Sequence, residues 1–309
     1  MIFTLLLTFL LFDMDNSNNG ELPDIDELWD YSKPAETEAA FRKLIPLARE
    51  MDDMAYYVML HTQIARTQSL QHKFDNAHAL LDYAHSNLTE DMTLPTVRHW
   101  LERGRTYNSE GQKEEAIECF VKAYEIAIGN NHEYYAVDAA HMLGIAETKD
   151  AQLEWNFIAI ETAEQSEEER TRKWLGALYN NVAWSFHDME HYHEALEYFE
   201  KGLEWRKEQN DASGIIVAKW AVGRTLRSLN RPEEAIKIHQ ELIKELKEKD
   251  LPPDGYVHEE MGENLFLLRK EKEAATHFGL AYEILSQDQY LQNNEPERLK
   301  RLKDMSKKR

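Results

Sequence analysis

A small residue returns along this chain at an almost constant interval. Alanine or glycine occurs at steps of 39, 40, 39, 40 and 39 residues, at Ala65, Gly104, Gly144, Ala183, Gly223 and Gly262. A second small residue follows twelve positions later in five of these six copies, at Ala77, Ala116, Ala195, Ala235 and Ala274. In the third copy Asn156 takes that place. Paired small residues at a fixed period predict closely packed helices, repeated in an array in which each unit contacts its neighbours.

The second copy carries the fullest form of the pattern. Two amphipathic helices broken at Glu110-Gly111 would place six of its residues in one seam: Trp100, Gly104, Tyr107, Ala116, Phe120 and Ala123. This arrangement resembles the tetratricopeptide repeat, whose pattern also runs Trp, Gly, Tyr, Ala, Phe. The resemblance covers roughly residues 54–286, and the long period is similar to that of the kinesin light chain type. It implies an all-α fold, a right-handed α-solenoid of six tetratricopeptide-like helix pairs with N- and C-terminal capping helices.

The expected organisation has four parts. They are an apolar start and disordered leader over residues 1–33, a capping helix over 34–53, six repeats over 54–288, and a capping helix with a basic tail over 289–309. The first twelve residues, MIFTLLLTFLLF, are too few to span a bilayer as a helix. They also lack the basic flank and the small residues of a signal peptide. We therefore favour Met14 as the true start over a signal or an anchor, and we expect no membrane partner.

Charge and cysteine content narrow the function classes. The chain has 36 basic and 57 acidic residues and a net charge of −21, so it would repel the phosphates of nucleic acids. Its single cysteine, Cys119, excludes an intramolecular disulfide and suits a reducing compartment, which favours the cytoplasm. Since Cys119 directly precedes the seam residue Phe120, we expect a packed thiol there.

No motif for catalysis stands out. The sequence contains no Gly-rich phosphate loop, HExxH, CxxC or GxSxG motif, so we expect no enzyme, no cofactor and no metal. Among the thirteen histidines, His187 and His191 are four apart, but a turn between two helices is expected to separate them. Scattered solvent-facing histidines are the preferred interpretation.

The resemblance also implies that the first helix of each pair lines a concave groove. Counting from the small residue, the groove positions of copies one to five carry six basic and two acidic side chains. Asn181 resembles the asparagine with which peptide-binding members hold a main chain. The candidate ligand-binding residues are Arg66, Arg98, Arg105, Asn180, Asn181, Trp184, Trp220, Arg224 and Arg227. Arginines would bind carboxylates, asparagines backbone amides and tryptophans an apolar side chain.

Two alternatives stay open at this point. The arginines could instead pair with acidic neighbours on their own helices, as Arg98 could with Glu102. The favoured function is a non-enzymatic scaffold that binds a peptide or protein segment in the groove, with an acidic segment as the form that the arginines favour. The other candidate is a bacterial peptide-sensing regulatory protein. The partner's identity and the oligomeric state do not follow from the sequence.

Overall fold

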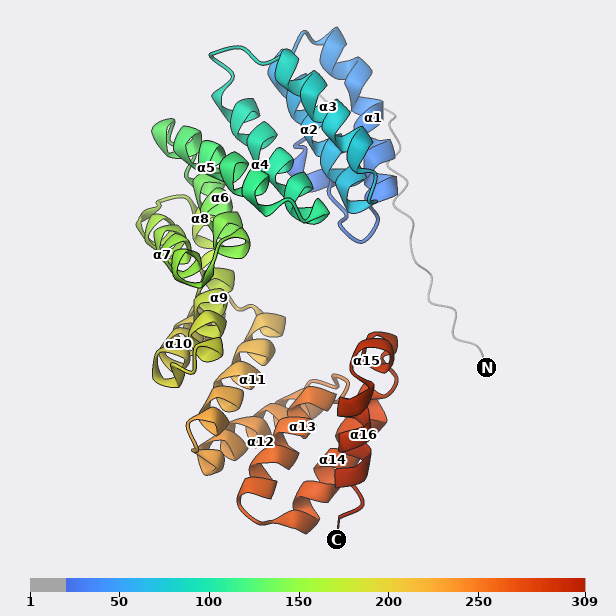
Figure 1. Ribbon diagram of the computed structural model, residues 1–309, viewed down its shortest axis with the longest axis vertical. Coiled ribbons are helices and arrows are strands. Elements are labelled where there is room, and N and C mark those ends of the chain that lie inside the picture. Colours follow the sequence, from blue (N-terminus) through green and yellow to red (C-terminus); the bar gives the residue numbers. More distant parts are fainter. Residues whose placement is uncertain (1–20, 309) are drawn as a thin grey trace, which may run out of the picture. The chain divides into compact units, whose positions relative to one another are not determined.

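The computed structural model describes residues 21–308, apart from the side chains of residues 149 and 150. The six predicted helix pairs are all present (Figure 1). They are α2 (Met54–Leu70) with α3 (Phe74–Ser86), α4 (Thr93–Glu110) with α5 (Lys113–Gly129), α6 (Glu133–Ala146) with α7 (Lys149–Gln165), α9 (Leu175–Asp188) with α10 (Tyr192–Glu208), α11 (Ala212–Ser228) with α12 (Pro232–Glu248), and α13 (Gly255–Leu267) with α14 (Glu271–Leu285).

Shorter elements and end helices complete the chain. They are the 3-10 turn η1 (Asp26–Leu28), α1 (Pro34–Glu50), α8 (Glu169–Arg172), α15 (Gln289–Asn294) and α16 (Pro296–Met305). The chain divides into two compact units, unit 1 up to Pro95 and unit 2 from Thr96. Within the described residues, no helix combines the length and apolar character needed to cross a membrane.

Most helices end in a residue with left-handed backbone conformation, which turns the chain sharply into the next helix. These residues are Asp52, His72, Gly111, Asn131, Glu190, Asn210, Asn230, Asp250 and Arg269. The amide that follows each of them closes the helix end, as when Lys73 N–H donates to the Gln68 carbonyl at 2.9 Å. Copy three differs, because Glu147 between α6 and α7 is extended, with φ −77° and ψ 171°.

The seams confirm the predicted close approach of the two helices in a pair. A Cβ atom on Gly104 would lie 2.5 Å from the ring of Phe120, and one on Gly262 would lie 2.8 Å from the ring of Phe278. Ala116 and Ala123 are fully buried beside the first of these rings. The absence of a side chain at the small position is therefore what admits an aromatic ring from the second helix.

The N-terminal segment corrects one expectation. Residues 22–29 lie in the stretch predicted to be a disordered or loosely docked leader, and they are docked: Ile25 is buried and the Tyr56 hydroxyl donates to the Pro23 carbonyl at 2.8 Å. The indole N–H of Trp29 donates to Gln63 Oε1 at 3.0 Å. Ile25 and Thr37 repeat the twelve-residue spacing of the seam, so this segment takes the place of a first helix beside α1. Residues 1–20 lie outside the described part of the chain.

The C-terminal helix α16 caps unit 2 as expected. Leu299, Leu302 and Met305 bury its apolar side, and α16 packs on α14. Arg298 of this helix binds Glu259 of α13 at 2.6 Å. Arg298 follows Glu259 by 39 residues, which is the period of the repeat. The helix α16 therefore occupies the position of a first helix in an incomplete further copy.

Candidate functional site

The first helices of unit 2 contact one another from copy to copy, with α9 against α11 and α11 against α13. We call the surface along which they do so the first-helix face. Polar side chains link the neighbouring helices in pairs separated by 33 to 41 residues. The pairs are Arg105 with Asp138, Asn181 with His141, His187 with Ser228, Arg227 with Glu260 and Arg298 with Glu259.

Two predicted groove arginines, Arg98 and Arg105, are held by the protein itself. Arg105 binds Glu102 at 2.9 Å and Asp138 at 2.5 Å, and its side chain is 14% exposed. Arg98 is buried and donates from Nη1 to the Tyr135 hydroxyl at 2.9 Å. The pairing of Arg105 with Glu102 is of the same-helix kind that the alternative interpretation described, whereas its bond to Asp138 and that of Arg98 to Tyr135 reach the next first helix.

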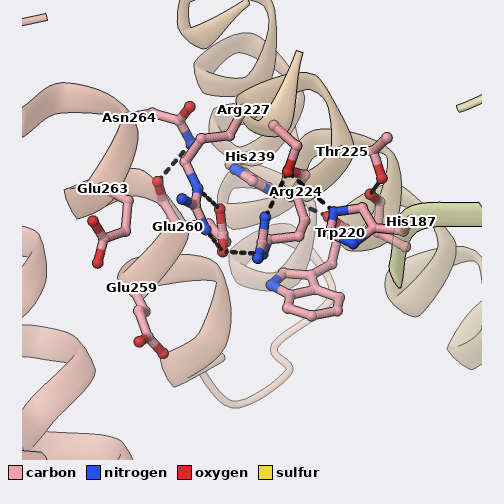
Figure 2. A network of polar contacts seen from close by, with 12 residues as sticks. His187, Trp220, Arg224, Thr225, Arg227, His239, Glu259, Glu260, Glu263 and Asn264 are labelled. Atoms are coloured by element: carbon pink, nitrogen blue, oxygen red, sulfur yellow. Dashed lines mark hydrogen bonds and ion pairs between the residues drawn. The ribbon is translucent and has the colours of Figure 1, made fainter. Parts of the chain in front are cut away.

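Arg224 and Arg227 share one carboxylate (Figure 2). Arg227 makes two bonds to Glu260, at 2.7 and 2.9 Å, while Arg224 Nε lies 3.2 Å from the same carboxylate. The nearby Glu259 and Glu263 bind arginines of α16 and act on this pair only through their charges. Two guanidinium groups therefore share direct contact with one carboxylate.

The pKa values of these two arginines are shifted in opposite directions. Burial, together with the charge of Arg227, lowers the pKa of Arg224. Burial acts in the same sense on Arg227, but the hydrogen bonds to Glu260, together with the charges of Glu260, Glu263 and Glu259, raise its pKa. Arg224 is therefore the less satisfied of the two charges, and its side chain is 27% exposed. It is the arginine of this face best placed to receive an external anionic group.

The histidines near this face are not the solvent-facing residues that we expected. His187 is half-buried, and its Nε2 lies 3.0 Å from Ser228 Oγ, which in turn accepts from Arg224 Nη1 at 2.9 Å. Burial and the Arg224 charge lower the pKa of His187. His239 is fully buried in the seam between α11 and α12, where it contacts Gly223.

The two predicted tryptophans form an aromatic step. The Trp184 and Trp220 ring centroids are 6.0 Å apart with an interplanar angle of 40°. Phe199 supports Trp184 edge-on at 4.9 Å, and Tyr256 lies against Trp220 at 6.4 Å. Both tryptophans are half-buried, so each offers part of a ring to a ligand.

A cavity of about 510 Å³ lies next to this step, between α6, α7 and α9. Its lining includes Asn181 and Trp184, which are candidate ligand-binding residues, and His141 and Asp188, which occupy counted groove positions but were not chosen as candidates. Asn156, where the repeat pattern breaks, and Gln152 also line it. Asn180 is half-buried beside Asn181 on α9. Arg66 is half-buried on α2, which belongs to unit 1.

The family comparison agrees with the seam pattern. The model of the family "Tetratricopeptide repeat" matches residues 97–127 and 176–209, which cover most of α4 with α5 and of α9 with α10. The chain contains tetratricopeptide repeats. Curated protein sequences give no match.

Solved structures share the fold of these tetratricopeptide repeats at low sequence identity. The apo form of RapI aligns with a TM-score of 0.72 and 15% identity, over 90% of this chain and 79% of that one. The apo quorum sensor NprR from B. thuringiensis aligns with a TM-score of 0.55 and 13% identity, over 90% and 78%. A signal transduction ATPase with a tetratricopeptide repeat sensor, from Pyrococcus horikoshii, gives 0.66 and 15%, over 90% of this chain but 44% of its own. The predicted all-α solenoid is thereby confirmed.

Proposed function

We propose that the first-helix face of unit 2 binds a peptide, or an extended segment of another protein, as a non-enzymatic interaction module. The observation that carries this proposal is the half-buried Trp184–Trp220 step beside a cavity lined by amide side chains. Tryptophan and arginine supply much of the binding energy at interfaces, and apolar walls with a few polar groups are typical of ligand sites.

Each part of the face has a distinct role in this proposal. Asn180 and Asn181 would hold the main chain of the segment, because an amide side chain can donate and accept at once. Trp184 and Trp220 would cover an apolar side chain. Arg224 would bind an acidic group of the segment. Arg105 already binds Asp138, so it is not expected to provide a second contact for an acidic group. An acidic residue of the partner is thus expected only there.

The second candidate function is a peptide-sensing regulatory protein. The similarity in fold to the quorum sensor NprR over 90% of this chain favours it. In such a protein a short peptide would change the spacing of the copies, and the contact between His187 and Ser228 is a link that it could tighten. Hydrogen exchange separates the two functions. A sensor would slow exchange in helices distant from the peptide, whereas a simple scaffold would slow it only at the site.

Selection of random peptides displayed on phage, with the full chain as bait, tests the proposed function. We expect enriched peptides whose synthetic forms bind the wild type in calorimetry. They should bind Trp220→Ala on the order of tenfold more weakly, since burial of a large aromatic area is lost. Tyr290→Ala, on the exposed surface of α15, is the matched control. Failure to enrich any peptide, or equal affinity for Trp220→Ala, would contradict the proposal.

A further inference from the structure

The third copy departs from the others at the seam position. Asn156 stands where five copies have alanine, and it is 1% exposed. Its amide fits only because residue 144 is glycine, since a Cβ atom there would lie 2.5 Å from Asn156 Nδ2. In the other copies that have glycine at this place, the space over it is filled by a ring four positions after the alanine, from Phe120, His239 or Phe278. In copy three the polar side chain of Asn156 fills that space instead.

One half of the Asn156 amide has a partner and the other half has none. Nδ2 donates to the Gln152 carbonyl at 2.8 Å, while the buried Oδ1 has no hydrogen-bond partner. A buried acceptor without a partner destabilises a folded protein. Because Asn156 lines the cavity between α6, α7 and α9, a ligand that donates a hydrogen bond there would relieve this cost.

The polar lining of this cavity offers several acceptors. Asp188 contributes a carboxylate, and Gln152, Asn156 and Asn181 contribute amide groups, each with an oxygen that accepts and an NH2 that donates. His141 is the one basic residue type among the lining residues, and burial lowers its pKa, which keeps it neutral. Its Nδ1 lies 3.3 Å from Asn181 Nδ2, and when that amide donates, the Asn181 oxygen stays available.

Apolar groups complete the cavity. Trp184, Ile145 and Met189 line it together with the acceptors. An indole face attracts a cation, and an aliphatic stem packs against apolar side chains while its charged end reaches polar groups. The cavity thus offers an apolar wall, several acceptors and one negative charge.

We propose that this cavity is a subsite for a lysine or arginine side chain of the segment bound at the first-helix face. The ammonium or guanidinium group only donates hydrogen bonds, which the Asp188 carboxylate and the amide oxygens of the lining can accept. Asp188 balances the charge and Asn156 selects for an N–H donor. The net charge of −21 attracts such a ligand over long range. This inference rests on the proposed function, and it adds a basic residue to the segment.

The same peptide selection tests the subsite. Peptides enriched on the full chain should share one position occupied by lysine or arginine. In a synthetic peptide, replacing that residue with norleucine or citrulline should weaken binding on the order of tenfold. Asp188→Asn should weaken the parent peptide similarly and leave the norleucine peptide unchanged. Glu190→Gln, an exposed acid outside the cavity, is the matched control and should bind as the wild type does.

Asn156→Ala separates binding from folding. It removes an unpartnered acceptor but also the hydrogen bond to the Gln152 carbonyl and the group that fills the space over Gly144. Urea denaturation must therefore show that the variant stays folded under the conditions of the binding assay. Its affinity for the basic peptide should nevertheless fall. Enriched peptides without a shared basic position would overturn the subsite and leave the proposed function standing. Undiminished binding of the basic peptide by both Asn156→Ala and Asp188→Asn would also overturn the subsite and leave the proposed function standing. Failure to enrich any peptide would overturn both proposals.

Discussion

Gly104 and Phe120 compete for the same space between α4 and α5. Since a Cβ atom on Gly104 would lie 2.5 Å from the ring, Gly104→Ala forces the ring or the helices to move. We expect a loss of roughly 1–3 kcal/mol in the free energy of unfolding, measured by urea denaturation. Gly129→Ala at the end of α5 meets nothing within 4 Å and should be nearly neutral. Equal stabilities for the two variants would contradict the assigned seam.

His239 gives the seam of copy five a dependence on pH. Burial and the charge of Arg227 lower its pKa to about 4, although a hydrogen bond to the Trp220 carbonyl and the charge of Asp254 act in the other direction. The unfolded chain, with a histidine pKa of about 6.5, binds the proton first as pH falls. This residue should therefore lower stability progressively between about pH 6.5 and pH 4, by at most about 3 kcal/mol.

His239→Phe isolates that contribution. Phenylalanine already fills the equivalent position at Phe120, Phe199 and Phe278, so the variant should fold with the same seam. Urea denaturation at a series of pH values should show a shallower loss of stability for the variant in this window. Parallel curves for the two proteins would mean that His239 does not titrate as its burial requires.

Sequence reasoning placed the groove residues on the right helices but not their partners. The position of Arg105 follows from the repeat, whereas its pairing with Asp138 depends on how α4 and α6 slide past each other. That offset is set by packing over whole copies, and no local pattern encodes it. The same holds for Glu260, which a count of groove positions left out although it binds both Arg224 and Arg227.

At the scale of elements, two arginines of α16 hold this helix against α13. Arg298 and Arg301 bind Glu259 and Glu263 of α13. Replacing both arginines with glutamate puts like charges together, so we expect α16 to separate from copy six and the free energy of unfolding to fall by about 1–3 kcal/mol. Faster chymotrypsin cleavage at Leu299 and Leu302, which none of the substitutions removes, would report the separation. Lys300→Glu, on the exposed side of the helix, should leave cleavage unchanged.

The sequence predicted where helices begin better than it predicted how they end. Pro34 and Pro232 each begin a helix, as expected for residues without a backbone N–H. In contrast, His72, Glu190 and Arg269 take the left-handed conformation that usually signals glycine. Tight packing of the next helix imposes that conformation, so composition alone could not reveal it. The docked segment at residues 22–29 was missed for a related reason, because it contains no long helical pattern.

At the scale of the whole molecule, the excess of 57 acidic over 36 basic residues is not offset by a free positive groove. Arg105, Arg227 and Arg298 all bind carboxylates of the chain. An approaching ligand therefore meets a negative field, which favours a basic segment over an acidic one during encounter. The acidic contact proposed at Arg224 acts only at short range.

This field predicts how binding of a basic peptide depends on salt. The Debye length is about 30 Å at 0.01 M salt and about 8 Å at 0.15 M, so long-range attraction is mostly lost between these conditions. We expect the association rate of the selected peptide to fall on the order of tenfold, while its dissociation rate changes far less. Stopped-flow fluorescence of Trp184 and Trp220 would follow both rates.

Two controls separate charge from apolar contact. The norleucine peptide should lose part of the salt dependence of the association rate. Trp220→Ala should raise the dissociation rate and leave the salt dependence of the association rate unchanged. An association rate that rises with salt would show that the ligand meets a field of its own sign, as an acidic segment would.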